Sequence, residues 1–150
     1  MRDLLLIENP HSGGGKHWEA EPFLEKLRET ETGVRHEKPE SPEECVRLVK
    51  ETEADAVAVA GGDGTLNPLL PTLIERQLPL LVLPAGTAND FARSLEMPET
   101  PEELAGLVTG GEITAVDVGY ANGKPFLNAA SIGMTNTISR LQTKERKSRL

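Results

Sequence analysis

A run of five small apolar residues at 56–60 constrains the fold of this chain more than any other segment. The run has no polar face, so it predicts a central strand that is covered on both sides, as in a parallel sheet. Further strands are expected at 4–8 and 78–83, which are mainly apolar, and helical patterns separate them. This alternation predicts an α/β fold in which crossover helices cover a parallel sheet.

Two capping boxes mark where helices begin. Ser41 with Glu44, and Pro42 at the first helical position, predicts a helix that extends to about residue 52. Residues 100–103 repeat this pattern for a helix that ends at the glycines of 110–111. A weaker strand is expected at 34–37, and further helices at 18–27, 65–76 and 91–95.

The pattern changes at residue 112, so we divide the chain into an α/β domain at 1–111 and the start of a β-rich second domain at 112–150. Two β-type runs, 113–120 and 125–132, are joined through Asn122 and Gly123, which predicts a hairpin. A hairpin alone is marginally stable in water. We therefore expect that the chain stops inside a second domain, or that this segment packs on the first domain or on another copy in a homodimer.

Composition narrows the class of protein. The 150 residues carry a net charge of −8, which disfavours a protein whose main partner is nucleic acid. No apolar run approaches the roughly 18 residues of a membrane span, and Glu8 ends the first apolar stretch too early for a signal peptide. With Cys45 as its single cysteine, the chain cannot form an internal disulfide, and we expect a cytoplasmic protein.

The last eleven residues, 140–150, differ in charge from the rest of the chain. They hold five basic residues against one acid, Glu145. Such a segment is typical of a solvated helix face, and it would also suit contact with a membrane surface or another domain.

Three loops follow predicted strands, at 9–16, 61–65 and 84–90. The carboxyl ends of parallel strands meet at one edge of a sheet, where ligands of such folds bind. Glycines in these loops let backbone N–H groups approach an anion closely, and Lys16 adds a positive charge. Asp63 stands where a carboxylate could hold a metal ion or orient a hydroxyl. Neither a Walker A loop nor a complete dinucleotide fingerprint is present, since Asn67 occupies the place of the third glycine.

These loops resemble one known family. Residues 61–65, Gly-Gly-Asp-Gly-Thr, are similar to the nucleotide-binding signature of the diacylglycerol kinase catalytic domain. Residues 9–13 resemble the N-P-x-S-G loop of its lipid-kinase branch, and residues 84–92 resemble its P-x-G-T-x-N-D-F-A segment. Segments 117–119, 126–128 and 131–133 resemble the entry into its second domain, so the match covers nearly the whole chain in order.

The resemblance implies ATP-dependent transfer of the γ-phosphoryl group, with Mg²⁺, to the hydroxyl of a diacylglycerol-like lipid. It implies peripheral contact with the inner face of the membrane. The residues it assigns to the nucleotide are Asn9, Ser12, Gly13, Gly61, Gly62, Gly64, Thr65, Gly86, Thr87 and Asn89. The residues it associates with activity are Asp63, Asp90 and Asp117, as metal or water ligands or as groups that orient the nucleophile. It does not identify the metal ligands.

Structural alternatives stay open for several of these residues. Asp90 could cap the helix that follows it, and Thr65 could be a helix N-cap. Asp117 could be an outward-facing strand residue, and Asn128 could close a turn.

Two other functions stay open. A relative with a soluble acceptor, such as an NAD kinase, would share the first domain, although the complete segment at 84–90 favours the lipid branch. A nucleotide-binding or regulatory fragment without catalysis would explain the short length. Pro68 stands where the family pattern has a glutamate. Because family members are longer than this chain, we expect weak nucleotide binding and little or no catalysis from it, unless it is part of a longer enzyme.

Overall fold

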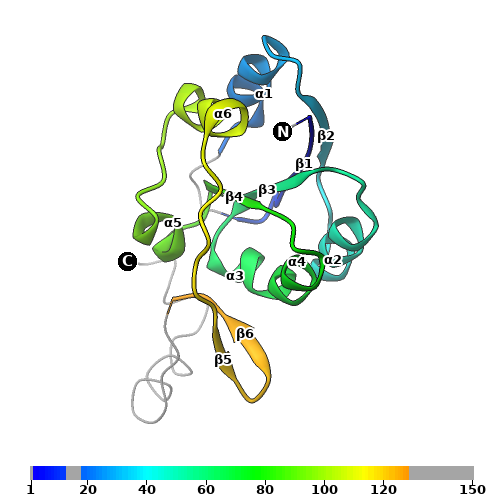
Figure 1. The fold of residues 1–150 in the computed structure, drawn as a ribbon, viewed down its shortest axis with the longest axis vertical. Coiled ribbons are helices and arrows are strands. Elements are labelled where there is room, and N and C mark those ends of the chain that lie inside the picture. Colours follow the sequence, from blue (N-terminus) through cyan, green and yellow to red (C-terminus); the bar gives the residue numbers. More distant parts are fainter. Residues whose placement is uncertain (1, 13–17, 129–150) are drawn as a thin grey trace.

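The computed structural model describes residues 2–12 and 18–128. Its main feature is one parallel sheet of four strands in the order β2-β1-β3-β4, which confirms the predicted α/β fold (Figure 1). The strands are β1 (Asp3–Glu8), β2 (Gly33–Glu37), β3 (Ala56–Gly61) and β4 (Leu80–Pro84). All four carboxyl ends therefore lie at the same edge of the sheet.

Burial explains why the small apolar run forms a central strand. Every residue of β3 is buried, and its side chains alternate between two hydrophobic clusters on opposite faces. Val57 and Val59 join the cluster that contains helix α2 (Pro42–Glu51), whereas Ala58 and Ala60 join the one that contains helix α1 (Ala20–Arg28). Helix α6 (Pro101–Gly110) covers the same face as α1.

The N-cap bonds of both expected capping boxes are confirmed, whereas the return bond from the N-cap N–H to the glutamate is formed in neither. The Ser41 hydroxyl accepts the Glu44 backbone N–H at 3.1 Å and begins α2, and the Thr100 hydroxyl accepts the Glu103 N–H at 3.3 Å and begins α6. A side-chain oxygen thus satisfies one of the N–H groups that the first turn leaves without a partner.

The single helix expected at 65–76 is wrong. The structure has three pieces there: α3 (Asp63–Leu66), the 3₁₀ turn η1 (Asn67–Leu69) and α4 (Leu70–Arg76). Pro68 and Pro71 have no N–H to donate, so the helical hydrogen-bond ladder is interrupted. Because α3 begins at Asp63 with Gly62 as its N-cap, the proposed N-cap role of Thr65 is also wrong.

A short hairpin follows α6. Strands β5 (Gly119–Ala121) and β6 (Lys124–Phe126) pair antiparallel, and Asn122 and Gly123 take positive φ values of 49° and 74° between them. This confirms the hairpin, but its strands are shorter than expected, since residues 112–118 cross the front of the molecule outside any strand (Figure 1). Leu127 is buried in the cluster that contains α2.

Some predictions fall outside what the structure describes. The end of the second β-type run and the basic segment lie beyond residue 128, and Gly13 and Lys16 lie within the gap at 13–17. The boundary at 111/112 stays a prediction. Within the described ranges, no helix combines the length and apolar character needed to span a membrane.

Candidate functional site

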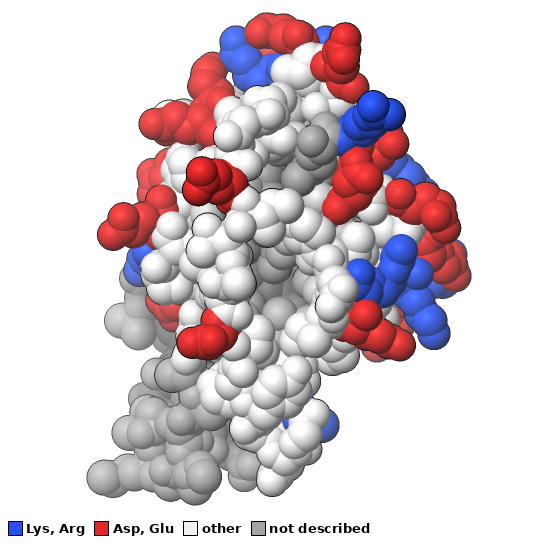
Figure 2. Space-filling view, in the orientation of Figure 1, with Lys and Arg blue, Asp and Glu red and all other residues white. Residues whose placement is uncertain are grey.

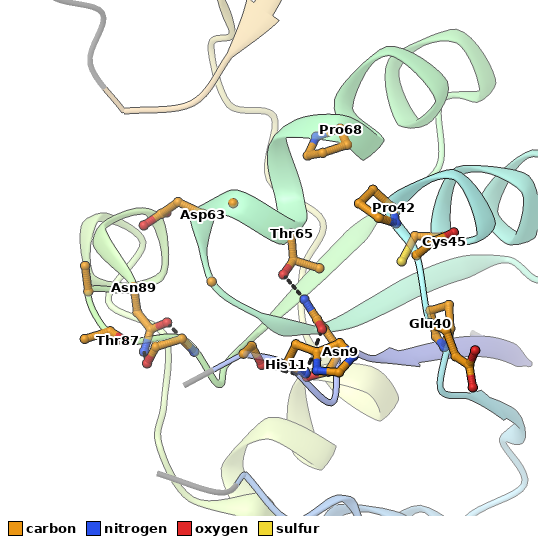
Figure 3. A pocket seen from close by; sticks show the side chains of 17 residues that line it. Asn9, His11, Glu40, Pro42, Cys45, Asp63, Thr65, Pro68, Thr87 and Asn89 are labelled. Carbon is orange, nitrogen blue, oxygen red and sulfur yellow. Dashed lines mark hydrogen bonds between the residues drawn. The ribbon is translucent and has the colours of Figure 1, made fainter. Parts of the chain in front are cut away.

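A cavity of about 470 Å³ opens at the carboxyl edge of the sheet (Figure 3). Four loops line it, one after each strand of the sheet. The structure therefore brings the three loops of the sequence analysis together and adds a fourth. The lining residues are Asn9, His11, Ser12, Pro39, Glu40, Ser41, Pro42, Cys45, Gly62, Asp63, Gly64, Thr65, Pro68, Gly86, Thr87, Ala88 and Asn89.

Two of these loops touch backbone to backbone at Gly62 and Gly86. A Cβ built on Gly62 would lie 3.1 Å from the Gly86 Cα, and one built on Gly86 would overlap the Gly62 Cα and lie 2.6 Å from the Asn89 Oδ1. Any side chain at Gly86 would push the loops apart. Glycine thus permits a close approach that leaves main-chain groups at the cavity wall.

The loop after β1 is fixed by Asn9. Its Nδ2 donates to the Thr65 hydroxyl at 2.7 Å, and its Oδ1 accepts the His11 N–H at 2.9 Å. The Ser12 hydroxyl donates to the Asn9 carbonyl at 2.8 Å. Asn9 therefore connects the β1 loop to α3, and Thr65 takes part through its side chain.

Asn89 closes the loop after β4 in a similar way. Its Oδ1 accepts the Gly86 N–H at 2.8 Å, and its Nδ2 donates to the Gly86 carbonyl at 3.0 Å. The residue takes a left-handed backbone conformation, with φ of 51°, directly before helix α5 (Asp90–Ser94). Thr87 is exposed at the tip of this loop.

Asp63 accepts three hydrogen bonds from residues far along the chain. The backbone N–H groups of Asp90 and Phe91 donate to its carboxylate, both at 3.1 Å, and the Asn128 Nδ2 donates at 3.0 Å. In Figure 3 its side chain points away from the Asn9–Thr65 pair. The first turn of α5 is thus capped by a side chain from the first residue of α3.

The other two acidic candidates lie outside the cavity wall. Asp90 is the first residue of α5, where Asn89 is the N-cap, so the alternative that Asp90 caps this helix is wrong. Its side chain is exposed. Asp117 is also exposed, and it belongs to the irregular segment before β5, so it is not the strand residue considered above.

The loop between β2 and α2 was missed by the sequence analysis. It contributes residues 39–42 and the nearby Cys45 to the cavity. Burial raises the pKa of the Cys45 thiol. The capping box at Ser41 was the available signal, because a helix that follows a parallel strand begins at the carboxyl edge of the sheet.

An ion-pair network lies beside this loop. Glu8, at the end of β1, contacts the His36 Nε2 at 2.8 Å and accepts a hydrogen bond from the Lys38 Nζ at 3.0 Å. It joins the ends of β1 and β2. In the part of the chain that the structure describes, no group of three or more His, Cys, Asp or Glu residues could hold a metal ion.

Comparison with known proteins points to one family. The family model for the diacylglycerol kinase catalytic domain matches residues 3–121. A diacylglycerol kinase of Staphylococcus epidermidis is 37% identical over 91 residues, which cover 59% of this chain and 29% of that protein. A protein of Enterobacter sp. named as a YegS-like lipid kinase is 41% identical over 102 residues, which cover 65% of this chain and 33% of that protein.

Solved structures of diacylglycerol kinases are also similar to this chain. The crystal structure of a diacylglycerol kinase from Bacillus anthracis matches 85% of this chain and 46% of its own, with a TM-score of 0.66 and 32% identity. A second structure from that organism matches with a TM-score of 0.73, 31% identity and coverage of 85% and 48%. The chain therefore spans less than half the length of these relatives.

Proposed function

Because this chain belongs to the diacylglycerol kinase catalytic domain family, we propose that its cavity binds ATP for phosphoryl transfer to a lipid hydroxyl. The observation that carries the proposal is the contact between Gly62 and Gly86, which joins two glycine-containing loops at the wall of one cavity. Backbone N–H groups of such loops are suitable donors to phosphate oxygens.

The size and composition of the cavity support a nucleotide. Its volume of about 470 Å³ falls within the roughly 300–1,000 Å³ that is typical of small-molecule sites. Pro42, Cys45 and Pro68 lie on one side in Figure 3, whereas Thr87 and Asn89 lie on the other. We propose that the polyphosphate lies against the glycine loops and the base against the proline side.

Phosphoryl transfer requires mainly that the two substrates are positioned and that charge on the phosphate oxygens is stabilised. Holding two reactants in the right geometry is worth about 7–11 kcal/mol. Asn9 and Thr65 serve this purpose by fixing the β1 loop to α3, and Asn89 serves it by closing the loop after β4.

Mg²⁺ accompanies nucleoside triphosphates in phosphoryl transfer and commonly keeps several water ligands. The described residues provide no cluster of ligands for it. The Asp63 carboxylate already accepts three hydrogen bonds. We therefore assign no step to the ion, and the activity-related roles of Asp63, Asp90 and Asp117 stay predictions.

The acceptor and the setting of the reaction are part of the same proposal. A diacylglycerol-like acceptor requires contact with a membrane surface, and we propose a cytoplasmic protein that binds peripherally in phospholipid metabolism. The net charge of −8 opposes approach to an anionic leaflet, so a basic segment would have to face it.

Binding is the first test. At an ATP concentration 100 times the Kd, ATP should stabilise the chain by about 2.7 kcal/mol and raise its Tm by about 5–10 °C. A chain whose Tm does not respond to ATP at any concentration contradicts the proposal.

Transfer is the second test. The chain is incubated with γ-labelled ATP and either diacylglycerol in mixed micelles or NAD, and the label in each product is measured. We expect label in the lipid above the blank without enzyme. Label in the NAD product alone would assign the chain to soluble-acceptor kinases instead.

A further inference from the structure

We propose that Asp63 is a positioning residue that holds the β4–α5 loop against the β3–α3 loop, rather than a ligand of metal or substrate. The proposal rests on the proposed function, since it concerns how the nucleotide cavity is shaped. It assigns the carboxylate a role different from the one that its place in the glycine signature implies.

The first argument is what the carboxylate already contacts. One oxygen accepts the Asp90 N–H at 3.1 Å, and the other accepts the Phe91 N–H at 3.1 Å and the Asn128 Nδ2 at 3.0 Å. A carboxylate has about four lone-pair sites, so three donors leave little acceptor capacity. Two of these donors are main-chain groups, which a substitution of the donor residue would not remove.

The second argument is that α5 has no cap of its own. Asn89, its N-cap residue, turns its side chain back onto Gly86 and makes no capping bond to α5. The first N–H groups of a helix need acceptors. Asp63 supplies them from 27 residues away in the chain.

The third argument is the arrangement of the loop. At one end of the loop Gly86 touches Gly62, and at the other end Asp90 and Phe91 bind Asp63. Thr87 and Ala88, which line the cavity, lie between these two fixed ends. Both ends are therefore held by two consecutive residues of the neighbouring loop, and loss of either contact would let the cavity wall move.

Asn128 extends the arrangement to the segment that follows β6. Its backbone has a φ of 70°, and its amide donates to the same Asp63 oxygen as Phe91. This contact is accessible to mutation, because glycine tolerates the backbone conformation and removes only the amide.

The test compares Asp63→Asn with the wild-type chain in calorimetric titrations with ATP, once with Mg²⁺ and once with EDTA. Asparagine has the shape of aspartate, but its NH₂ group cannot accept a backbone N–H. A positioning role predicts that affinity falls by about tenfold or more in both titrations, by the same factor. Asn128→Gly should give a smaller loss, again equal with and without Mg²⁺.

A metal-ligand role predicts opposite signs. Removing a negative charge would strengthen binding of metal-free ATP and weaken binding of MgATP, and that result would overturn the proposal. Unchanged affinity in both titrations would overturn it as well. Glu99→Gln, at an exposed acid, controls for the change in net charge.

Hydrogen exchange without nucleotide separates this proposal from the proposed function. Exchange at the Asp90 and Phe91 amides should be faster in Asp63→Asn, because their acceptor is lost. Unchanged exchange overturns the positioning role even if ATP binds. A wild-type chain that binds no ATP overturns the proposed function and the nucleotide role together, while faster exchange would still establish the contact.

Discussion

The two ends of the sheet differ in how their polar groups are used. At the carboxyl end, glycine backbones and amide and hydroxyl side chains surround a cavity of about 470 Å³. At the amino end, charged side chains bind the main chain: the Asp55 carboxylate accepts the Arg2 and Asp3 N–H groups at 2.8 and 3.1 Å. The Arg76 guanidinium donates to the carbonyls of residues 49, 50 and 52.

The amino end also has a cavity, which at about 740 Å³ is larger than the cavity at the carboxyl end. It is lined by residues 2–3, 30–33 and Thr109. Size therefore does not single out the site. What distinguishes the carboxyl end is that four loops meet there and that two of them touch through glycine backbones.

Figure 2 adds a difference in charge. On the face that it shows, acidic side chains lie along the top, the left side and the right, and most of the visible basic ones lie at the top and right. The lower middle, over the β5–β6 hairpin, is nearly free of both. A phosphate group near the hairpin on this face would therefore meet less repulsion from acidic side chains than one near the helices.

The largest effect is expected at the carboxyl end from Gly86→Ala. The added Cβ overlaps Gly62, so the loops must separate, and we expect a stability loss of about 1–3 kcal/mol together with at least a tenfold loss of ATP affinity. Thermal melts and calorimetric titration measure the two.

Gly106→Ala is the matched control for this change. Gly106 lies inside α6, and a Cβ there meets nothing within 4 Å. Alanine should stabilise this helix by about 0.5–1 kcal/mol and leave ATP affinity unchanged. If both alanine variants bind ATP like the wild type, the Gly62–Gly86 contact is not part of the site.

A smaller effect, confined to stability, is expected at the amino end from Arg76→Met. The substitution keeps the apolar stem of the side chain. It removes the donor that satisfies the carbonyls of residues 49 and 50 in the last turn of α2 and of residue 52, at a cost of about 1–2 kcal/mol. ATP affinity should not change. Arg76→Lys retains a positive donor and should recover part of the lost stability. If Arg76→Met also lowered ATP affinity, the amino end of the sheet would not be independent of the nucleotide site.

The smallest effect is expected from Asp55→Asn, and it depends on pH. Hydrogen bonds from the Arg2 and Asp3 N–H groups lower the pKa of Asp55. The folded state therefore gains stability from this group above the ordinary aspartate pKa of about 4, and loses it as the pH falls through the lowered folded value.

Melts of both chains from pH 7 to pH 2 measure this difference. The wild type should be the more stable at pH 7, and the two curves should approach each other at the acid end. Glu53→Gln, at an exposed neighbouring acid, controls for net charge. A difference that grows as the pH falls would reverse the expected sign.

The sequence predicted best what is decided locally or by burial. The buried run at 56–60, the N-caps Ser41 and Thr100 and the Asn122–Gly123 turn are all present in the structure. The helix expected at 65–76 is divided into three pieces, because Pro68 and Pro71 lack the N–H groups that a continuous helix needs.

The site was predictable only in outline. A parallel sheet places its loops at one edge, and that much follows from the order of the elements. The pairing of Asp63 with the α5 backbone and with Asn128 joins residues 27 to 65 positions apart, and no local pattern encodes it. The β2–α2 loop carries no glycine signature, so its place in the cavity also had to come from the structure.

An ATP titration monitored through the backbone amides of ¹⁵N-labelled chain compares the two ends of the sheet in one experiment. Binding at the carboxyl edge predicts saturable shifts at Gly62, Gly64, Gly86 and Thr87, with residues 30–33 unchanged. The opposite result would be saturable shifts at residues 30–33, beside the larger cavity, with no shifts in the glycine loops. That result would contradict the assignment of the nucleotide to the carboxyl edge.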